Sequence, residues 1–122
     1  MPIYKADTLG KIGEEWAHLF LQACGFMKVA ARYRRPGGEI DLVMRRDDLL
    51  VFVEVKTRGS GCCGMPEEAV HRRQLGRLRR LAHQFLLENP CWRTMTYRLD
   101  VVAVEFEGEG VGCRLRHYTG VG

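Results

Sequence analysis

The sequence predicts a mixed α/β fold, in which one central sheet is flanked by helices in a restriction-endonuclease-like order: helix, three strands, helix, strand and a short trailing strand. Three observations predict it: an apolar helical period near the N-terminus, three short apolar segments separated by turn residues, and a second amphipathic segment before another long apolar strand. Three strands joined by short turns form an antiparallel meander, so we expect a mixed sheet and not a doubly wound parallel one. Residues 1–122 are expected to form a single domain.

The first helix is expected to begin at Asp7 or Thr8, either of which can cap it, and to run to about Cys24, where Gly25 ends it. Glu14 lies just outside the apolar stripe of this helix. The residues expected to form the stripe and pack in the core are Leu9, Ile12, Trp16, Leu19, Phe20 and Ala23.

Three strands follow, because short apolar segments alternate with turn residues. A turn with the sequence Arg-Arg-Pro-Gly-Gly separates the first from the second, and a polar Arg-Arg-Asp-Asp turn separates the second from the third. A glycine-rich loop over 57–66 comes next. The expected strands are 27–33, 39–44 and 50–56.

A second helix is expected from Pro66 to about Glu88, where Asn89 and Pro90 end it. Gln74 falls inside its apolar arc, which indicates that this amide faces a polar site. The arc consists of Val70, Leu75, Leu78, Leu81, Ala82 and Phe85, and the opposite side carries Arg72, Arg73, Arg77, Arg79 and Arg80. A strong strand at 97–106 and a short one at 113–118 complete the chain.

Composition narrows the classes of function. The net charge is +4, from 19 basic and 15 acidic residues, and arginine far outnumbers lysine. Because arginine favours bidentate phosphate contacts, this bias favours a nucleic-acid partner, although a GC-rich genome would produce the same bias. No apolar run approaches the ~18 residues of a membrane span, and no signal peptide opens the chain, so we expect no membrane partner and a cytoplasmic location. Five cysteines without a C-x-x-C pair argue against a disulfide framework and a zinc site.

Charged residues interrupt two of the expected strands. Asp41 lies in the second strand, and Glu54-Val55-Lys56 interrupts the apolar third strand. Side chains alternate along a strand, so Glu54 and Lys56 point to the same face. Glu39 is expected to face away from Asp41 and to contact solvent or the turn. Since buried charges pair with one another or hold a metal, the two acids and the lysine predict a divalent-cation site.

These motifs resemble those of the PD-(D/E)xK, or restriction-endonuclease-like, nuclease superfamily. That superfamily has an αβββαβ core and an Asp on one strand followed by (Asp/Glu)-x-Lys on the next, which Asp41 and Glu54-Val55-Lys56 match. The chain is more closely similar to the YraN-like family of uncharacterised bacterial proteins. The matching motifs are Gly-x-x-Gly-Glu-x-x-Ala at 10–17, Gly-Glu-Ile-Asp-Leu at 38–42, Phe-Val-Glu-Val-Lys-x-Arg at 52–58 and the late strand at 98–102. The resemblance extends from Gly10 to about His117, and archaeal Holliday-junction resolvases share the constellation.

The resemblance implies phosphodiester hydrolysis with Mg²⁺, for which Mn²⁺ is a substitute. Asp41, Glu54 and the Val55 carbonyl would hold the cation, and Glu14 would bind a second metal or position a metal-bound water. Lys56 would orient or deprotonate the attacking water. The residues expected to contact nucleic acid are Arg58, Gln74, Arg73, Arg77 and Arg80. The family commonly has Lys where this chain has Gln74, which leaves a cationic role there in doubt.

Three functions remain open at this point. The first is a nuclease acting on DNA in preference to RNA, on branched or repair and recombination intermediates, with a homodimer supplying two sites. The second is a catalytically silent nucleic-acid-binding module. The third is an accessory protein in which Glu54 and Lys56 form a structural ion pair. Two further residues are expected to be structural: Asp100, bonded to Arg98 or to backbone, and His71, packed near the start of the second helix.

Overall fold

The computed structural model of the chain describes residues 6–59, 72–107 and 112–121. Its element order confirms the mixed α/β class and the succession of helices and strands predicted above. The elements are α1 (Ala6–Ala23), β1 (Met27–Arg35), β2 (Gly38–Arg46), β3 (Leu49–Arg58), α2 (Arg72–Glu88), the short 3₁₀ helix η2 (Pro90–Trp92), β4 (Thr96–Glu107) and β5 (Gly112–Tyr118).

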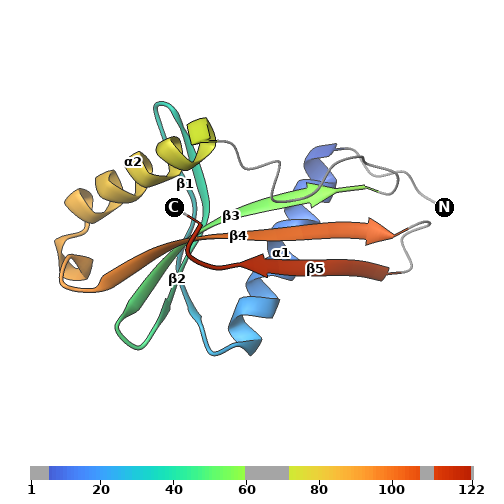
Figure 1. Cartoon of the computed structure of the whole chain (residues 1–122), viewed down its shortest axis with the longest axis horizontal. Helices are drawn as coiled ribbons and strands as arrows, with labels where there is room; N and C mark the ends of the chain where they lie inside the picture. The colour runs from blue at the N-terminus through green and yellow to red at the C-terminus, as the bar shows by residue number, and fades with distance from the viewer. Residues whose placement is uncertain (1–5, 60–71, 108–111, 122) are drawn as a thin grey trace.

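The five strands form one mixed sheet in the order β1-β2-β3-β4-β5. All neighbours are antiparallel except β3 and β4, which run parallel. A parallel pair needs a crossover connection, and the segment containing α2 provides it. Helices α1 and α2 lie on opposite faces of the sheet (Figure 1). The result is a three-layer sandwich with an apolar core on each side.

The two cores take alternate side chains of β3, whereas in β2 the alternation breaks at Asp41, since Ile40 and Leu42 belong to opposite cores. On the α2 side, Phe52 packs edge-to-face against Phe85 and Tyr97, with ring centroids 5.6 and 5.8 Å apart. The other buried members on this side are Tyr33, Ile40, Val43, Leu50, Leu78, Leu81, Ala82 and Leu99. The α1 side is filled by Ala17, Leu21, Phe26, Leu42, Met44, Val51, Val53, Val102 and Val104.

The core stripe predicted for α1 was wrong in part. Gly13, Ala17 and Leu21 are buried, whereas the predicted stripe residues Trp16 and Leu19 are 47% and 46% exposed and Ala23 is also exposed. The reason is the small size of Gly13 and Ala17, which lets the helix approach the sheet closely along their side. The larger side chains then flank this contact and do not fill it.

The apolar arc predicted for α2 is confirmed for Leu78, Leu81, Ala82 and Phe85, which are all buried. The part of this helix predicted before Arg72, with Val70 and His71, lies outside the described residues. Within the part of the chain that the structure describes, neither α1 nor α2 is long and apolar enough to cross a membrane.

Asp100 is the one charged side chain among the described residues that is completely buried. It accepts hydrogen bonds from Arg98 Nε and Nη2 at 2.8 and 2.9 Å and from the Gly120 N–H at 3.0 Å, and it lies 2.7 Å from His117 Nε2. Burial alone would raise the pKa of Asp100, but the bonds to His117, Arg98 and Gly120 together hold that pKa below its ordinary value. The predicted bonds to Arg98 and to backbone are therefore confirmed, and they tie β4 to the chain after β5.

Candidate metal centre

Strands β2 and β3 separate where the predicted site lies. Their ladder runs from the Arg46–Leu49 pair to the Leu42–Val53 pair, and no pairing joins Asp41 to Glu54 beyond it. Beyond the last backbone pair, the Asp41 side chain bonds to β3 instead, because its Oδ2 accepts a hydrogen bond of 2.7 Å from the Val55 N–H. One oxygen of the carboxylate is thereby fixed against β3.

Three carboxylates converge beside this opening. Glu14 reaches in from α1, and Glu39 and Asp41 come from β2. One oxygen of each lies within 4.8 Å of the other two. The prediction that Glu39 faces away from Asp41 was wrong, since the two carboxylates meet. On a regular strand their two-residue spacing would already have placed both side chains on one side. That spacing was the sequence signal that could have identified Glu39.

The electrostatics of this acidic centre are unfavourable without a counter-ion. Burial, and next the charge of Glu54, raise the pKa of Asp41 to about 7, while the Val55 N–H acts in the opposite direction. The charges of Glu14 and Glu39 make smaller contributions to the same rise in pKa. The centre therefore holds a proton on Asp41 through much of the range below neutral pH, and a bound cation would favour its ionised form.

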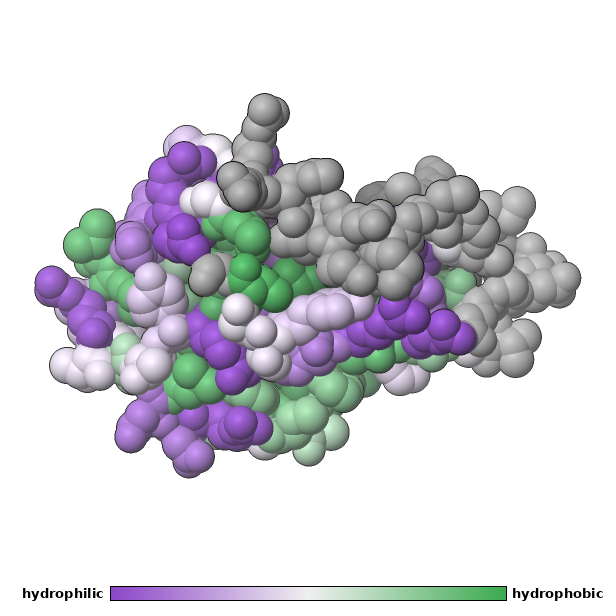
Figure 2. Space-filling view, in the orientation of Figure 1, coloured by the Kyte–Doolittle hydropathy of each residue, from purple (hydrophilic) through white to green (hydrophobic). Residues whose placement is uncertain are grey.

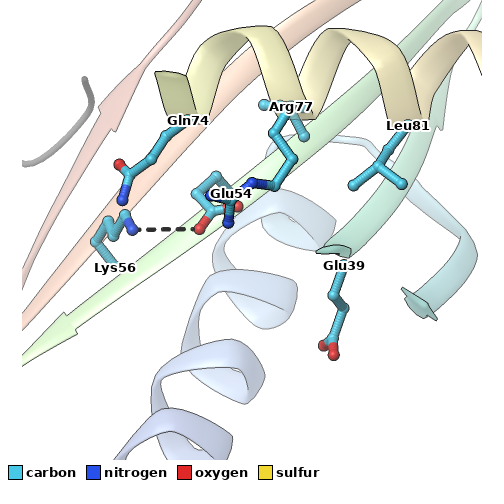
Figure 3. A pocket seen from close by; sticks show the side chains of 7 residues that line it. Glu39, Glu54, Lys56, Gln74, Arg77 and Leu81 are labelled. Carbon is cyan, nitrogen blue, oxygen red and sulfur yellow. Dashed lines mark ion pairs between the residues drawn. The ribbon is translucent and has the colours of Figure 1, made fainter. Parts of the chain in front are cut away.

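Glu54 and Lys56 lie on the same face of β3, as predicted, and form an ion pair of 3.3 Å (Figure 3). Both side chains are about three-quarters buried, with 26% and 24% exposed. Burial raises the pKa of Glu54, and the charges of Lys56 and Arg77 oppose this shift. Among the described residues, Glu54 does not belong to the three-carboxylate group, so it acts on Asp41 through its charge.

Helix α2 forms the wall of a pocket above Glu54 and Lys56. Gln74 points from the helix toward Lys56, and Arg77 extends toward Glu54 (Figure 3). The Gln74 Oε1 atom is buried and has no hydrogen-bond partner among the residues that the structure describes. Its polar surroundings agree with the prediction that this amide faces a polar site. An unpartnered buried carbonyl indicates an acceptor suited to a ligand or water.

The turn between β1 and β2 fits closely beneath α2. Gly38 has φ 153°, and a β-carbon there would lie 2.6 Å from Cδ of Arg77. A residue with a side chain at this position would force the Arg77 and Leu81 side chains, or the hairpin itself, to shift. Gly38 therefore helps to hold Glu39, the next residue, at the edge of the pocket.

Of the other predicted nucleic-acid contacts, Arg77 lines this pocket. Arg77 and Arg80 are exposed on α2, whose outer surface is largely hydrophilic (Figure 2). Arg58 is half-buried at the end of β3, and the side chain of Arg73 lies outside the described part of the structure. Arg80 lies one turn further along α2 and Arg58 two residues beyond Lys56 on β3, so their contact with a bound nucleic acid stays a prediction.

Sequence reasoning missed Arg32. It lies between the Ala31–Leu42 and Tyr33–Ile40 pairs, across from Asp41, and has φ 52°. A positive φ is uncommon outside glycine and costs on the order of 1 kcal/mol. The Arg32 Nε donates to Glu14 Oε1 at 3.1 Å. No sequence signal marks a left-handed arginine.

The donor set of the acidic centre fits a divalent cation. Mg²⁺ and Mn²⁺ prefer oxygen ligands, and three carboxylate oxygens from two elements already approach one another here. A cation would also relieve the repulsion that raises the pKa of Asp41. The observed hydrogen bond fixes the Val55 N–H, and a role for its carbonyl as a ligand stays a prediction.

Fold and site together define a mixed α/β protein with an acidic centre where two central strands separate. The chain belongs to the uncharacterised protein family UPF0102, whose model matches residues 13–104, and this confirms the resemblance to the YraN-like family. It is 47% identical to a UPF0102 protein of Beutenbergia cavernae, over 95% of this chain and 97% of that protein. A UPF0102 protein of an Arthrobacter species is 43% identical over the same shares, and one of Chloroherpeton thalassium is 41% identical over 80% of this chain and 74% of that protein.

Proposed function

We propose that the chain is a metal-dependent nuclease of the PD-(D/E)xK type that hydrolyses phosphodiester bonds in DNA in the cytoplasm. The observation that carries this proposal is the position of Asp41 beside the Glu54-x-Lys56 strand where β2 and β3 separate. Glu14 and Glu39 add oxygen ligands at the same place. An acidic centre bordered by a lysine suits a reaction whose substrate and transition state are anionic.

Mg²⁺, or Mn²⁺ in its place, would be held by Asp41, Glu14 and Glu39, with Glu54 and the Val55 carbonyl adjacent. When bound, such a cation neutralises charge on the phosphodiester and lowers the pKa of a coordinated water. The Val55 N–H keeps one oxygen of Asp41 engaged, which orients the carboxylate.

Lys56 is the residue that would act on the substrate. Its ammonium lies 3.3 Å from Glu54, within a partly buried pocket where charge interactions are stronger than in water. Once Glu54 faces a cation, Lys56 is no longer its main counter-charge. Lys56 would then orient the attacking water, and its positive charge would favour loss of the water proton to solvent and stabilise negative charge on the phosphate.

Branched DNA is the proposed substrate class, by analogy with the resolvases. A branched duplex has two backbones to cut, and one chain of this size offers one acidic centre. A homodimer would supply two sites in two-fold register. Light scattering at micromolar concentration tests this point, and a monomer would contradict it.

The test of the function is cleavage of labelled single-stranded, duplex, flap and four-way-junction DNA with Mg²⁺ or Mn²⁺. The wild type should cut at least one substrate, whereas Asp41→Asn and Lys56→Ala should not. Asp47→Asn, in the exposed β2–β3 turn, is the matched control and should cut normally. Equal cutting by all four proteins would indicate a contaminating nuclease and contradict the proposal.

A catalytically silent nucleic-acid-binding module is the second candidate. The observation that favours it is the Glu54–Lys56 ion pair, which engages the lysine. Binding that weakens with salt, without cleavage of any substrate, would support this alternative. Failure to bind nucleic acid at any salt concentration would instead favour an accessory protein in which the pair is structural.

A further inference from the structure

A groove lies on the α1 side of the acidic centre, away from the pocket under α2. Residues of α1, β1 and β2 line it, and Glu14 belongs both to this groove and to the acidic centre. The groove is therefore directly adjacent to the place where a scissile phosphate would bind. Its charged and titratable lining residues are Lys11, Glu14, Glu15, His18, Lys28 and Arg32.

Cationic side chains border this groove from two elements. Lys11 comes from α1, while Lys28 and Arg32 come from β1. Lys11 and Lys28 are exposed, and the Arg32 side chain is 46% exposed. Two acidic residues, Glu14 and Glu15, also line the groove, and Glu14 is already paired with Arg32. Separate cations along an open groove suit a polyanion better than a single small anion.

Arg32 connects the groove to the acidic centre. Its guanidinium has five N–H donors, of which Nε binds Glu14. The terminal nitrogens can therefore contact a phosphate oxygen while Glu14 stays in place. The backbone of Arg32 adopts φ 52° directly across the ladder from Asp41. Asparagine or glycine would adopt this backbone conformation more readily than arginine. The presence of arginine therefore indicates that its side chain has a function at this position.

We propose that this groove binds the phosphodiester backbone of a nucleic-acid strand next to the cleaved phosphate, through Arg32, Lys28 and Lys11. The location of the cleaved phosphate rests on the proposed nuclease function. The groove itself is defined by its charges and is tested without cleavage. It places nucleic acid on the α1 side of the sheet, in addition to the arginines of α2.

The test is fluorescence anisotropy of a labelled 20-nucleotide single strand and the corresponding duplex, in EDTA, between 50 and 200 mM NaCl. Each phosphate contact contributes about 0.7 to 0.9 to the slope of log affinity against log salt. The Lys11→Gln/Lys28→Gln double variant should lower this slope by about 1.4 to 1.8 and weaken binding at least tenfold at 50 mM NaCl. Arg93→Gln, in the exposed turn before β4, removes one positive charge outside the groove and should leave the slope unchanged.

Arg32 is tested separately with Arg32→Asn and Arg32→Gly, both of which tolerate a positive φ. Weaker nucleic-acid binding with an equal or higher Tm would support a binding role. A lower Tm with unchanged affinity would show a structural role and overturn the assignment of Arg32.

The outcomes for groove and function are distinguishable. A reduced salt slope in the double variant, together with no cleavage by the wild type, supports nucleic-acid binding in the groove and contradicts the nuclease function. Cleavage by the wild type, together with a salt slope of the double variant equal to that of Arg93→Gln, overturns binding in the groove and leaves the nuclease function in place. A wild-type protein that binds neither probe overturns the groove, and its lining is then a solvated charged surface only.

Discussion

Gly13 of α1 packs against Thr57 of β3 so closely that a β-carbon on Gly13 would overlap the Thr57 hydroxyl. The next residue, Glu14, belongs to the acidic centre. This contact therefore sets the distance of α1 from the sheet and with it the position of one carboxylate. Stability and the geometry of the site are linked at a single pair of residues.

Gly13→Ala should destabilise the protein by about 1 to 3 kcal/mol, because overpacking outweighs the helix propensity that alanine adds. Cleavage should fall as well, because Glu14 moves with α1. Thr57→Ala removes the hydroxyl and the methyl group that the new β-carbon would meet, so the double variant should recover part of the loss. Urea denaturation of the wild type, the two single variants and the double variant gives the coupling free energy between the two positions. Additive changes in the free energy of unfolding would disprove the contact.

Asp41 should make the metal-free protein less stable as the pH rises. Its pKa is about 7 in the folded chain and 3.8 as the unperturbed value, so the native state binds the proton more tightly. Stability is then lost between about pH 4 and pH 7, by up to about 4 kcal/mol. Thermal denaturation in EDTA from pH 5 to 8 should show this decrease for the wild type and a smaller one for Asp41→Asn, which keeps an acceptor for the Val55 N–H. Parallel curves for the two proteins would refute the assignment.

Gln74 should contribute to activity at a cost in stability, because its buried Oε1 has no partner within the described part of the chain. Gln74→Met keeps the length of the side chain and removes the unsatisfied atom, so the free energy of unfolding should rise by about 1 kcal/mol. Cleavage should fall, since the amide points toward Lys56 (Figure 3). Leu78→Met on the same helix is a control for methionine itself. A stability loss in Gln74→Met would mean that the amide has a partner in solution.

Asp100 should matter for stability and not for chemistry. Asp100→Ala leaves Arg98 and His117 without their buried partner and should cost about 3 kcal/mol, the lower end for a broken buried ion pair because Arg98 is partly exposed. The rate of cleavage per folded molecule should stay unchanged at a temperature well below Tm. A rate loss that exceeds the loss of folded protein would place Asp100 in the active machinery.

The sequence was sufficient for the element order, the positions of the strands and the meeting of Asp41 with the Glu54-x-Lys56 strand, because each follows from local periodicity. It was not sufficient for the packing of α1. The helical period marks Trp16 and Leu19 as apolar, but close approach depends on the small residues at 13 and 17. The position of Arg32 was also inaccessible, since a positive φ leaves a sequence signal mainly at glycine and asparagine.

The acidic centre around Asp41 should bind a divalent cation, and this binding can be tested without knowing the substrate. The measurement is calorimetric titration of Mn²⁺ at pH 6.5 in two buffers of different ionisation enthalpy. Cation binding should displace the proton held by Asp41, so the wild type should show binding with release of somewhat less than one proton. Asp41→Asn should lose that binding, and Asp47→Asn should keep it. Absence of Mn²⁺ binding by the wild type, or equal binding by Asp41→Asn, would contradict the account.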